Sequence, residues 1–218
     1  MPRQSATRHS HDISGVILAG GLSRRMGGGD KALRMLGGKT MLAHVIERLA
    51  PQAARLVLNA NGDPARFAAY GLPVAPDPIE GFAGPLAGVL AGMRWSLTHA
   101  PGCAWVVSAA ADTPFFPTDL TERFLAAAGG VCDRVVLAGS GGEVHPVFGL
   151  WPVALADDLE QAVIGGVRKV LDWTDRHDRV TVEFPFMDTG DTKIDPFFNA
   201  NRPDDWEQAQ LFLAKMRR

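Results

Sequence analysis

Short apolar runs alternate with longer segments of helical character through the first 130 residues of the chain. Predicted buried strands cover residues 16–19, 55–58, 73–75 and 103–107. Predicted helices cover residues 40–49, 65–70, a stretch from residue 85 to about residue 97, and residues 119–128. Strands and helices in alternation predict a parallel sheet with helices on both faces.

The segment that begins near residue 84 shows how a helix is recognised in this pattern. Gly84 and Pro85 are the residue types that commonly begin a helix. The apolar residues that follow at helical spacing are Leu86, Val89, Leu90, Met93 and Leu97. We therefore expect this stripe to face the core.

The remainder of the chain continues the pattern less regularly. Strands are predicted at residues 134–138, 144–151 and 180–184, and helices at 155–164, 167–173 and from Pro203 onward. The fold class that we predict is α/β: a three-layer Rossmann-like sandwich with a mostly parallel central sheet and helices on both faces. Residues 13–218 are expected to form a single domain behind a disordered polar tail, residues 1–12.

Composition narrows the class of protein. The 218 residues are 46% hydrophobic and 21% charged, with a net charge of −2, which is typical of a globular protein with a real core. This balance gives no reason to expect nucleic acid or a membrane as a partner. Cys103 and Cys132 have neither disulfide-motif nor zinc-ligand spacing, so we expect both to be buried free thiols in a cytoplasmic protein.

The loop after the first strand combines glycine with positive charge. The sequence LAGGLSRRMGGGDKAL spans residues 18–33 and includes Arg24, Arg25 and Lys31. Glycines allow the backbone to approach a ligand closely, and basic side chains favour a polyphosphate. The loop is not a P-loop, because Ala32 follows Lys31 where a hydroxyl is required, and it does not fit the dinucleotide fingerprint. A flexible loop with solvated arginines is the alternative interpretation.

Polar groups follow four of the predicted strands, at Gly20, Asn59, Asp77 and Asp112. In parallel sheets the ligand lies at the carboxyl ends of the strands, so these residues are expected to meet at one edge. Asp112 could hold Mg²⁺, which uses one or two carboxylates in phosphate sites, or could instead cap the turn before Pro114. Asp77 could accept hydrogen bonds from a base, or be a solvated loop residue between two prolines.

The glycine-rich loop resembles the signature loop of nucleotidyltransferases that activate sugars, alditols and cofactors with a nucleoside triphosphate. Leu18-Ala19-Gly20-Gly21 together with Met26-Gly27 is similar to the form found in the molybdenum cofactor guanylyltransferases. The resemblance implies transfer of GMP from GTP to molybdenum-molybdopterin, with release of pyrophosphate and with Mg²⁺ as cofactor. Apoproteins of molybdoenzymes, or their chaperones, are further expected partners.

The same resemblance assigns candidate residues. The residues that match the family's GTP contacts are Leu18, Ala19, Gly20, Lys31, Asn59, Asp77 and Asp112, and we add Gly21, Arg25 and Gly84 to this set. Asp112 is the expected metal ligand, because the Asp of this DTP turn has that role in similar proteins. Arg25, Lys31 and Asp112 are the expected catalytic residues, with Arg25 and Lys31 neutralising the triphosphate and the departing pyrophosphate.

The second half of the chain is expected to bind the acceptor. Residues 13–128 would bind the nucleotide and residues 129–218 the acceptor. In the family an Asn-x-Asn pair before the last helix lies beside the acceptor or metal; here it is Asn199 and Asn201, although packing or helix capping is the alternative. Arg202 departs from the Thr that is common there, and His145 is a weaker acceptor-site candidate.

Two other functions fit the sequence. A cytidylyltransferase could act on the same cofactor, although such enzymes tend to have Leu-Ala-Ala-Gly where this chain has Leu-Ala-Gly-Gly. A non-catalytic nucleotide-binding or cofactor-delivery protein could retain the loop, but the presence of Lys31 and Asp112 favours an enzyme.

Overall fold

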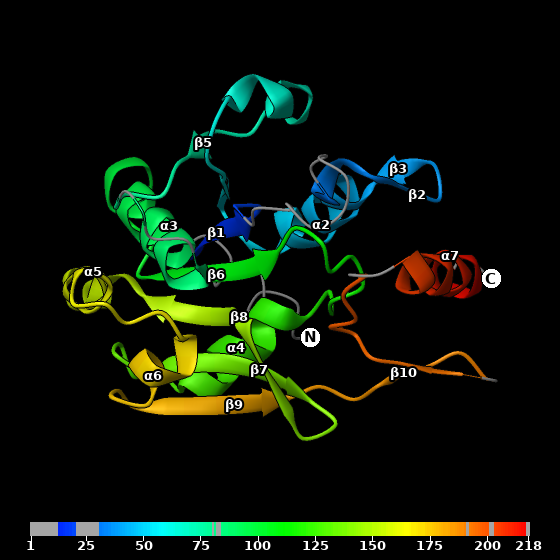
Figure 1. Cartoon of the computed structure of the whole chain (residues 1–218). Coiled ribbons are helices and arrows are strands. Elements are labelled where there is room, and N and C mark those ends of the chain that lie inside the picture. The colour runs from blue at the N-terminus through cyan, green and yellow to red at the C-terminus, as the bar shows by residue number, and fades with distance from the viewer. Residues whose placement is uncertain are drawn as a thin grey trace, which may run out of the picture.

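A seven-stranded sheet forms the centre of the computed structural model, which describes residues 13–20, 31–79, 81, 84–190, 192–200 and 203–216 (Figure 1). The strand order is β5 (Val74–Ala75), β4 (Arg55–Asn59), β1 (Ile13–Leu18), β6 (Trp105–Ala110), β8 (Glu143–Pro152), β7 (Val135–Ser140) and β9 (Arg179–Glu183). Within this sheet β8 runs antiparallel to both of its neighbours, whereas the other neighbouring pairs are parallel. The predicted mostly parallel sheet is confirmed.

Strand β1 lies between β4 and β6, and the register of these three strands aligns their ends. Leu18 pairs with Asn59 of β4 on one side and with Ala110 of β6 on the other. Val16 and Ile17 are fully buried, which explains why the strand is apolar on both faces. The residues that follow the three strands therefore meet at one edge of the sheet.

Helices cover both faces of the sheet. On one face, α2 (Met41–Leu49) and α4 (Leu120–Ala128) contribute Val45 and Phe124 to one apolar cluster. On the other face, α3 (Pro85–His99), α5 (Ala156–Ile164) and α6 (Val170–Thr174) contribute residues such as Leu90, Leu159 and Trp173 to a second cluster. The result is the predicted three-layer arrangement, visible in Figure 1.

Helix α3 approaches the sheet unusually closely. Gly88 and Gly92 lie one turn apart, and a Cβ atom on Gly92 would lie only 2.6 Å from the Cβ atom of Val16 in β1. A Cβ atom on Gly88 would lie 2.4 Å from Oδ1 of Asn59. These glycines therefore let the helix pack directly on the ends of β1 and β4. The expected stripe is correct except for Leu97, which is 48% exposed because it lies near the solvent-facing end of the helix.

A third apolar cluster joins the C-terminal helix α7 (Pro203–Met216) to the sheet edge. It includes Leu36, Met41, Phe115, Ile194 and Phe212. Two small antiparallel ribbons contribute to it, β2 (Met35–Leu36) with β3 (Lys39–Thr40), and β10 (Met187–Asp188) with β11 (Lys193–Ile194). Neither ribbon was predicted, because two-residue strands are too short to produce an alternating pattern. In Figure 1, α7 and β10 lie on the side toward which β6 and β9 point.

Four 3₁₀ segments complete the described elements: η2 (Lys31–Leu33), η3 (Ala50–Gln52), η4 (Pro64–Tyr70) and η5 (Val153–Leu155). Segment η4 was predicted as an ordinary helix, but it is confined between a capping Asp63 and Gly71, which has φ of 64°. Short confined segments favour the tighter helix.

Three further expectations meet different outcomes. Strand β6 begins at Trp105, two residues later than expected, because the backbone N–H of Cys103 bonds Ala100 in a turn after α3. Cys103 is buried and outside any disulfide, as expected, whereas Cys132 is exposed in the turn between α4 and β7, so the prediction that Cys132 is buried was wrong. Across the described helices, none is both long and apolar enough to cross a membrane.

Candidate active site

The ends of β1, β4 and β6 form the floor of the candidate site. The N–H of Ala19 donates to the carbonyl oxygen of Asn59 over 2.9 Å, and the N–H of Ala111 donates to that of Leu18 over 3.0 Å. A Cβ atom on Gly20 would lie 3.3 Å from Oδ1 of Asn59. The backbone hydrogen bonds between neighbouring strands thus continue past the strand ends, and they place the predicted strand-end residues at one edge of the sheet.

Lys31, Asp112 and Asn199 form a closed hydrogen-bonded cluster at this edge. Nζ of Lys31 lies 2.6 Å from Oδ2 of Asp112 and 2.6 Å from Oδ1 of Asn199. Nδ2 of Asn199 donates to Oδ1 of Asp112 over 3.1 Å. The side chains of Lys31 and Asp112 are 17% and 26% exposed, so the ion pair is partly shielded from water but still accessible to a ligand.

Asp112 is held in the turn that follows β6. Thr113 beside it is buried, and its N–H lies 3.4 Å from the carbonyl oxygen of Ala110. The carboxylate of Asp112 and the amide oxygen of Asn199 are hard oxygen donors, which suit a divalent cation such as Mg²⁺. No cluster of three His, Cys, Asp or Glu side chains that could enclose a metal occurs among the described residues. A single carboxylate fits Mg²⁺, which completes its coordination with water and substrate phosphates.

Asp77 is fixed by two asparagines rather than left free in solvent. Nδ2 of Asn59 donates to one carboxylate oxygen over 2.9 Å, and Nδ2 of Asn61 donates to the other over 2.7 Å. The N–H of Asp77 donates in return to Oδ1 of Asn61 over 2.9 Å. Asn61 was not predicted as a site residue, although it belongs to the Asn-Ala-Asn sequence at the end of β4. The Asp77 carboxylate is therefore oriented before any ligand arrives.

His145 belongs to a second cluster, with Ser140 and Asp195. The hydroxyl of Ser140 donates to Oδ1 of Asp195 over 2.8 Å and lies 2.6 Å from Nε2 of His145. Because the only hydroxyl proton is directed at Asp195, Nε2 of His145 must be the donor to Ser140. The serine thus lies between histidine and carboxylate, which is not the order of a nucleophilic triad.

This second cluster anchors the segment that carries Asn199. The ring of His145 stacks on that of Phe197, with centroids 4.5 Å apart, and the N–H of Phe197 donates to Oδ1 of Asp195 over 2.8 Å. Burial lowers the pKa of His145, although the nearby carboxylates of Asp195, Glu143 and Glu183 oppose this shift. The cluster therefore fixes residues 195–200, and His145 is connected to the site through this segment.

Comparison with known proteins now identifies the family. Residues 15–180 match the MobA-like NTP transferase domain. The chain belongs to the MobA-like NTP transferase family. A protein of Bradyrhizobium sp. (strain ORS 278) named molybdenum cofactor guanylyltransferase is 53% identical over 203 residues, 93% of each chain. A protein of the same name from Mesorhizobium japonicum is 48% identical over 94% of this chain and 98% of its own.

A solved structure shares the family's fold. Molybdopterin-guanine dinucleotide biosynthesis protein A from Archaeoglobus fulgidus superposes with a TM-score of 0.71 at 25% identity, covering 93% of this chain and all of the other. The family placement expected from the glycine-rich loop is confirmed, and the protein is a nucleotidyltransferase.

The structure brings together part of the predicted site. Leu18, Ala19, Gly20 and Asn59 lie at the sheet edge, while Gly84 precedes α3 in extended backbone, with φ of 162°. Asn199, expected near the acceptor, is hydrogen-bonded to Lys31 and Asp112, two of the residues predicted to contact GTP. Gly21, Arg25 and Asn201 lie outside the described residues, as does the tail of residues 1–12. Sequence reasoning missed Asn61, Ser140 and Asp195.

Proposed function

We propose that this protein transfers GMP from GTP to molybdenum-molybdopterin and releases pyrophosphate. Relatives named molybdenum cofactor guanylyltransferase, 53% and 48% identical to this chain, support the proposal. The observation that carries it is the Lys31–Asp112–Asn199 cluster, which places an ammonium and a carboxylate within 2.6 Å of each other at the carboxyl ends of β1 and β6. Nucleotidyl transfer requires both charges: the ammonium binds the phosphates of the nucleotide, and the carboxylate binds the metal ion that accompanies them.

The base would be selected by Asp77. Guanine presents an N1–H and an exocyclic amino group side by side, and a carboxylate can accept from both, whereas cytosine lacks this pair of donors. Asn59 and Asn61 hold the Asp77 carboxylate at 2.9 Å and 2.7 Å, so little entropy would be lost in orienting it. The sheet edge at Leu18, Ala19 and Gly20 would lie along the nucleotide.

The phosphates would be bound by Lys31 and by a metal ion on Asp112. Nucleotidyltransferases generally use a divalent metal, and the partly exposed carboxylate of Asp112 fits Mg²⁺. When bound, Mg²⁺ supplies positive charge to the phosphate oxygens and to the departing pyrophosphate. The ammonium of Lys31 donates to a phosphate oxygen, and Arg25 supplies further positive charge.

The transfer itself requires no covalent enzyme intermediate. An oxygen of the acceptor's terminal phosphate forms a bond to the α-phosphorus of GTP, and the bond from that phosphorus to the bridging oxygen of pyrophosphate breaks. The protein's contribution is to hold the two reactants in line and to neutralise charge. Asn199, which is hydrogen-bonded to both Lys31 and Asp112, would orient the acceptor phosphate together with Asn201.

This assignment divides the domain into two functional parts. Residues 13–128 bind GTP, and residues 129–218 bind the acceptor with His145, Asn199 and Asn201 near it. The protein acts in the cytoplasm, and apoproteins of molybdoenzymes or their chaperones receive the product. Cytidylyl transfer to the same acceptor, and nucleotide binding without turnover, are the rival functions.

One assay separates the three functions. The purified protein is incubated with molybdenum-molybdopterin, Mg²⁺ and either GTP or CTP, and both pyrophosphate and the dinucleotide product are measured. The proposal expects a guanine dinucleotide and an equal amount of pyrophosphate with GTP, and little of either with CTP. Formation of the cytosine dinucleotide from CTP would show that the protein is a cytidylyltransferase. Nucleotide binding without formation of either dinucleotide would show that it is a non-catalytic delivery protein.

A further inference from the structure

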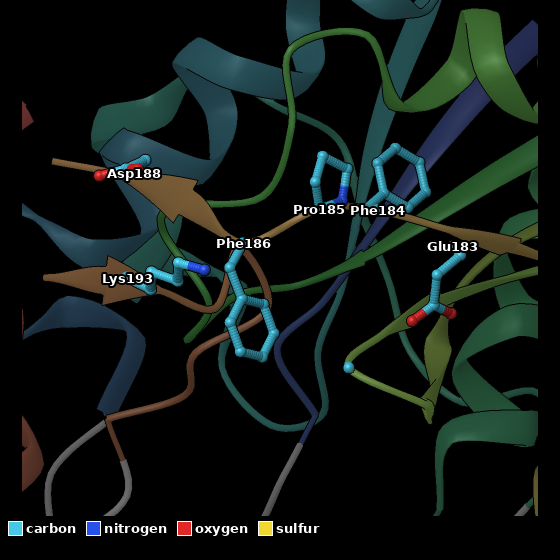
Figure 2. Close-up of a pocket in the computed structure, with 7 residues that line it drawn as sticks. Glu183, Phe184, Pro185, Phe186, Asp188 and Lys193 are labelled. Carbon is cyan, nitrogen blue, oxygen red and sulfur yellow. The ribbon is translucent and has the colours of Figure 1, made fainter. Parts of the chain in front are cut away.

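A cavity of about 400 Å³ opens at the corner of the molecule between β9 and the β10–β11 ribbon. Its lining includes Gly141 from the β7–β8 turn, the 184–186 connection, and Glu183, Asp188 and Lys193 from the adjoining strands. Figure 2 shows these side chains. Neither the sheet-edge cluster nor the assigned GTP contacts use any of them.

The chemistry of this cavity suits a planar ring with polar edges. Phe186 is 43% exposed although it is a large aromatic residue. In Figure 2 its ring stands between the ammonium of Lys193 on one side and the carboxylate of Glu183 on the other, while Asp188 points away from it. An exposed aromatic face flanked by a donor and an acceptor is the usual composition of a site for a heterocyclic ring.

The walls of the cavity are fixed in place. Oε1 of Glu183 accepts a hydrogen bond of 2.9 Å from the N–H of Gly142, so the carboxylate is tied to the β7–β8 turn. Arg123 donates to the carbonyl oxygen of Glu183 over 2.8 Å, and its guanidinium lies 4.1 Å from the ring centre of Phe184. Phe186 packs on Gly141, where a Cβ atom would lie only 2.9 Å from the ring. A ligand would therefore meet a preformed surface.

The cavity is connected to the catalytic cluster through short stretches of chain. Gly141 follows Ser140, which is hydrogen-bonded to Asp195 over 2.8 Å. Lys193 lies two residues before Asp195, and the segment that begins at Asp195 leads to Asn199 and its bonds with Lys31 and Asp112. The walls of the cavity and the segment that carries Asn199 are therefore parts of one hydrogen-bonded structure.

We propose that this cavity binds the pterin ring of the acceptor, with its terminal phosphate directed toward Asn199 and Asp112. The ring stacks on Phe186, its N–H and amino groups donate to Glu183, and its carbonyl oxygen accepts from Lys193. This inference rests on the proposed function, because the pterin belongs to the proposed acceptor. It assigns the recognition of the ring to Glu183, Phe186 and Lys193, which lie outside the Asn-x-Asn pair.

The test compares Phe186→Ala and Lys193→Met with Phe186→Tyr, which retains the ring. Matched controls outside the cavity lining are Ile164→Ala, at the end of α5, where the side chain is 55% exposed, and Lys169→Met, at an exposed lysine before α6. GTP-dependent dinucleotide formation is measured at varied acceptor concentration, and GTP binding is titrated separately. In addition, 6-hydroxymethylpterin is titrated with each protein while its fluorescence is followed.

Phe186→Ala should raise the KM for the acceptor about tenfold, because stacking on an aromatic side chain contributes this order of affinity. The kcat and the GTP affinity should stay unchanged, Lys193→Met should raise the same KM, and Phe186→Tyr and both controls should behave as wild type. The wild type should quench the pterin fluorescence more strongly than Phe186→Ala does.

Two failures are distinguishable. Normal turnover by the wild type, with the acceptor KM unchanged in Phe186→Ala and Lys193→Met, would overturn the pterin site and leave the proposed function standing. Pterin binding that depends on Phe186, in a protein that makes no dinucleotide, would support the site and overturn the proposed transfer.

Discussion

In the half of the sheet formed by β5, β4, β1 and β6, neighbouring strands are parallel and the site residues directly follow strand ends. The half formed by β8, β7 and β9 includes the antiparallel strand β8, and its pairing with β7 shifts register between Leu137 and Ala138 of β7. This half contributes to the site through residues 195–200, the segment that carries Asn199. Backbone pairing aligns the strand ends of the first half, whereas in the second half the carboxylate of Asp195 fixes the segment by accepting from Ser140 and from the N–H of Phe197.

This difference has a consequence for function. Asn59, Asn61 and Asp77 are separated by at most 18 residues in the chain, so the part of the site that we propose to bind the base forms locally. Asn199 lies 168 residues from Lys31 and 87 from Asp112, so the cluster forms only when both halves have folded together. We expect changes in the first half to alter nucleotide binding, and changes in the second half to alter transfer.

The largest expected effect belongs to Asp112, where the two halves meet. Asp112→Asn preserves volume but removes the charge that a hard cation requires, so turnover should fall by ~10²–10³ with the fold unchanged. Raised Mg²⁺ should partly restore it. Asp119→Asn is the matched control, because Asp119 lies on the same loop, is exposed, and makes no side-chain cap bond. Near-normal turnover of Asp112→Asn at low Mg²⁺ would show that Asp112 only caps the turn and does not bind the metal ion.

A second prediction concerns the close contact of α3 with the nucleotide half. Gly88→Ala would place a Cβ atom 2.4 Å from Oδ1 of Asn59 and 2.8 Å from Cδ2 of Leu18. Relieving this overlap should lower the free energy of unfolding by about 1–3 kcal/mol and should weaken GTP binding, because Asn59 must move. Gly102→Ala, where a Cβ atom meets nothing within 4 Å, is the control. Chemical denaturation and a GTP titration measure the two effects, and a Gly88→Ala protein equal to wild type in both would contradict this packing.

Base selection should depend on Asp77 and, more weakly, on Asn61. Asp77→Ala should reduce the preference for GTP over CTP by about tenfold, because the N1–H and amino group of guanine lose the carboxylate that accepts from them. Turnover at saturating nucleotide should change less. Asn61→Ala leaves the carboxylate and its bond from Asn59 but removes the bond from Asn61 to the other carboxylate oxygen, so the same preference should fall by a smaller factor. Competition binding with both nucleotides checks this, and equal wild-type affinities for GTP and CTP would disprove the assignment of the base.

The smallest expected effect is a pH dependence in the acceptor half. Burial lowers the pKa of His145 below its ordinary value of 6.5, so the unfolded chain binds this proton more readily than the folded chain. The stabilisation is present above the ordinary pKa and is lost as the pH falls through the lowered value. Between about pH 7.5 and about pH 5.5, wild type should therefore lose more stability than His145→Gln, which retains a donor for Ser140. Identical acid dependence of the two proteins would contradict this role.

The two halves also differ in how far the sequence predicts them. Alternation of strands and helices places Gly20, Asn59 and Asp112 at one edge, because parallel strands end together. The Lys31–Asn199 contact follows from no local pattern, since it depends on how residues 195–200 return across the sheet edge. The β10–β11 ribbon does not follow from the sequence pattern, because each of its strands is only two residues long. The roles of Ser140 and Asp195 do not follow from it either, because a polar residue in a strand or loop gives no indication of its partner.

The most direct test of this division is the affinity of Asn199→Ala for GTP, measured by calorimetric titration beside wild type and beside a parallel assay of turnover. Asn199 bonds both Lys31 and Asp112, yet we assign it to the acceptor. The account predicts a GTP dissociation constant within about threefold of wild type together with a large loss of dinucleotide formation. A loss of GTP affinity of about a hundredfold in a protein that remains folded would contradict it, because Asn199 would then belong to the nucleotide site.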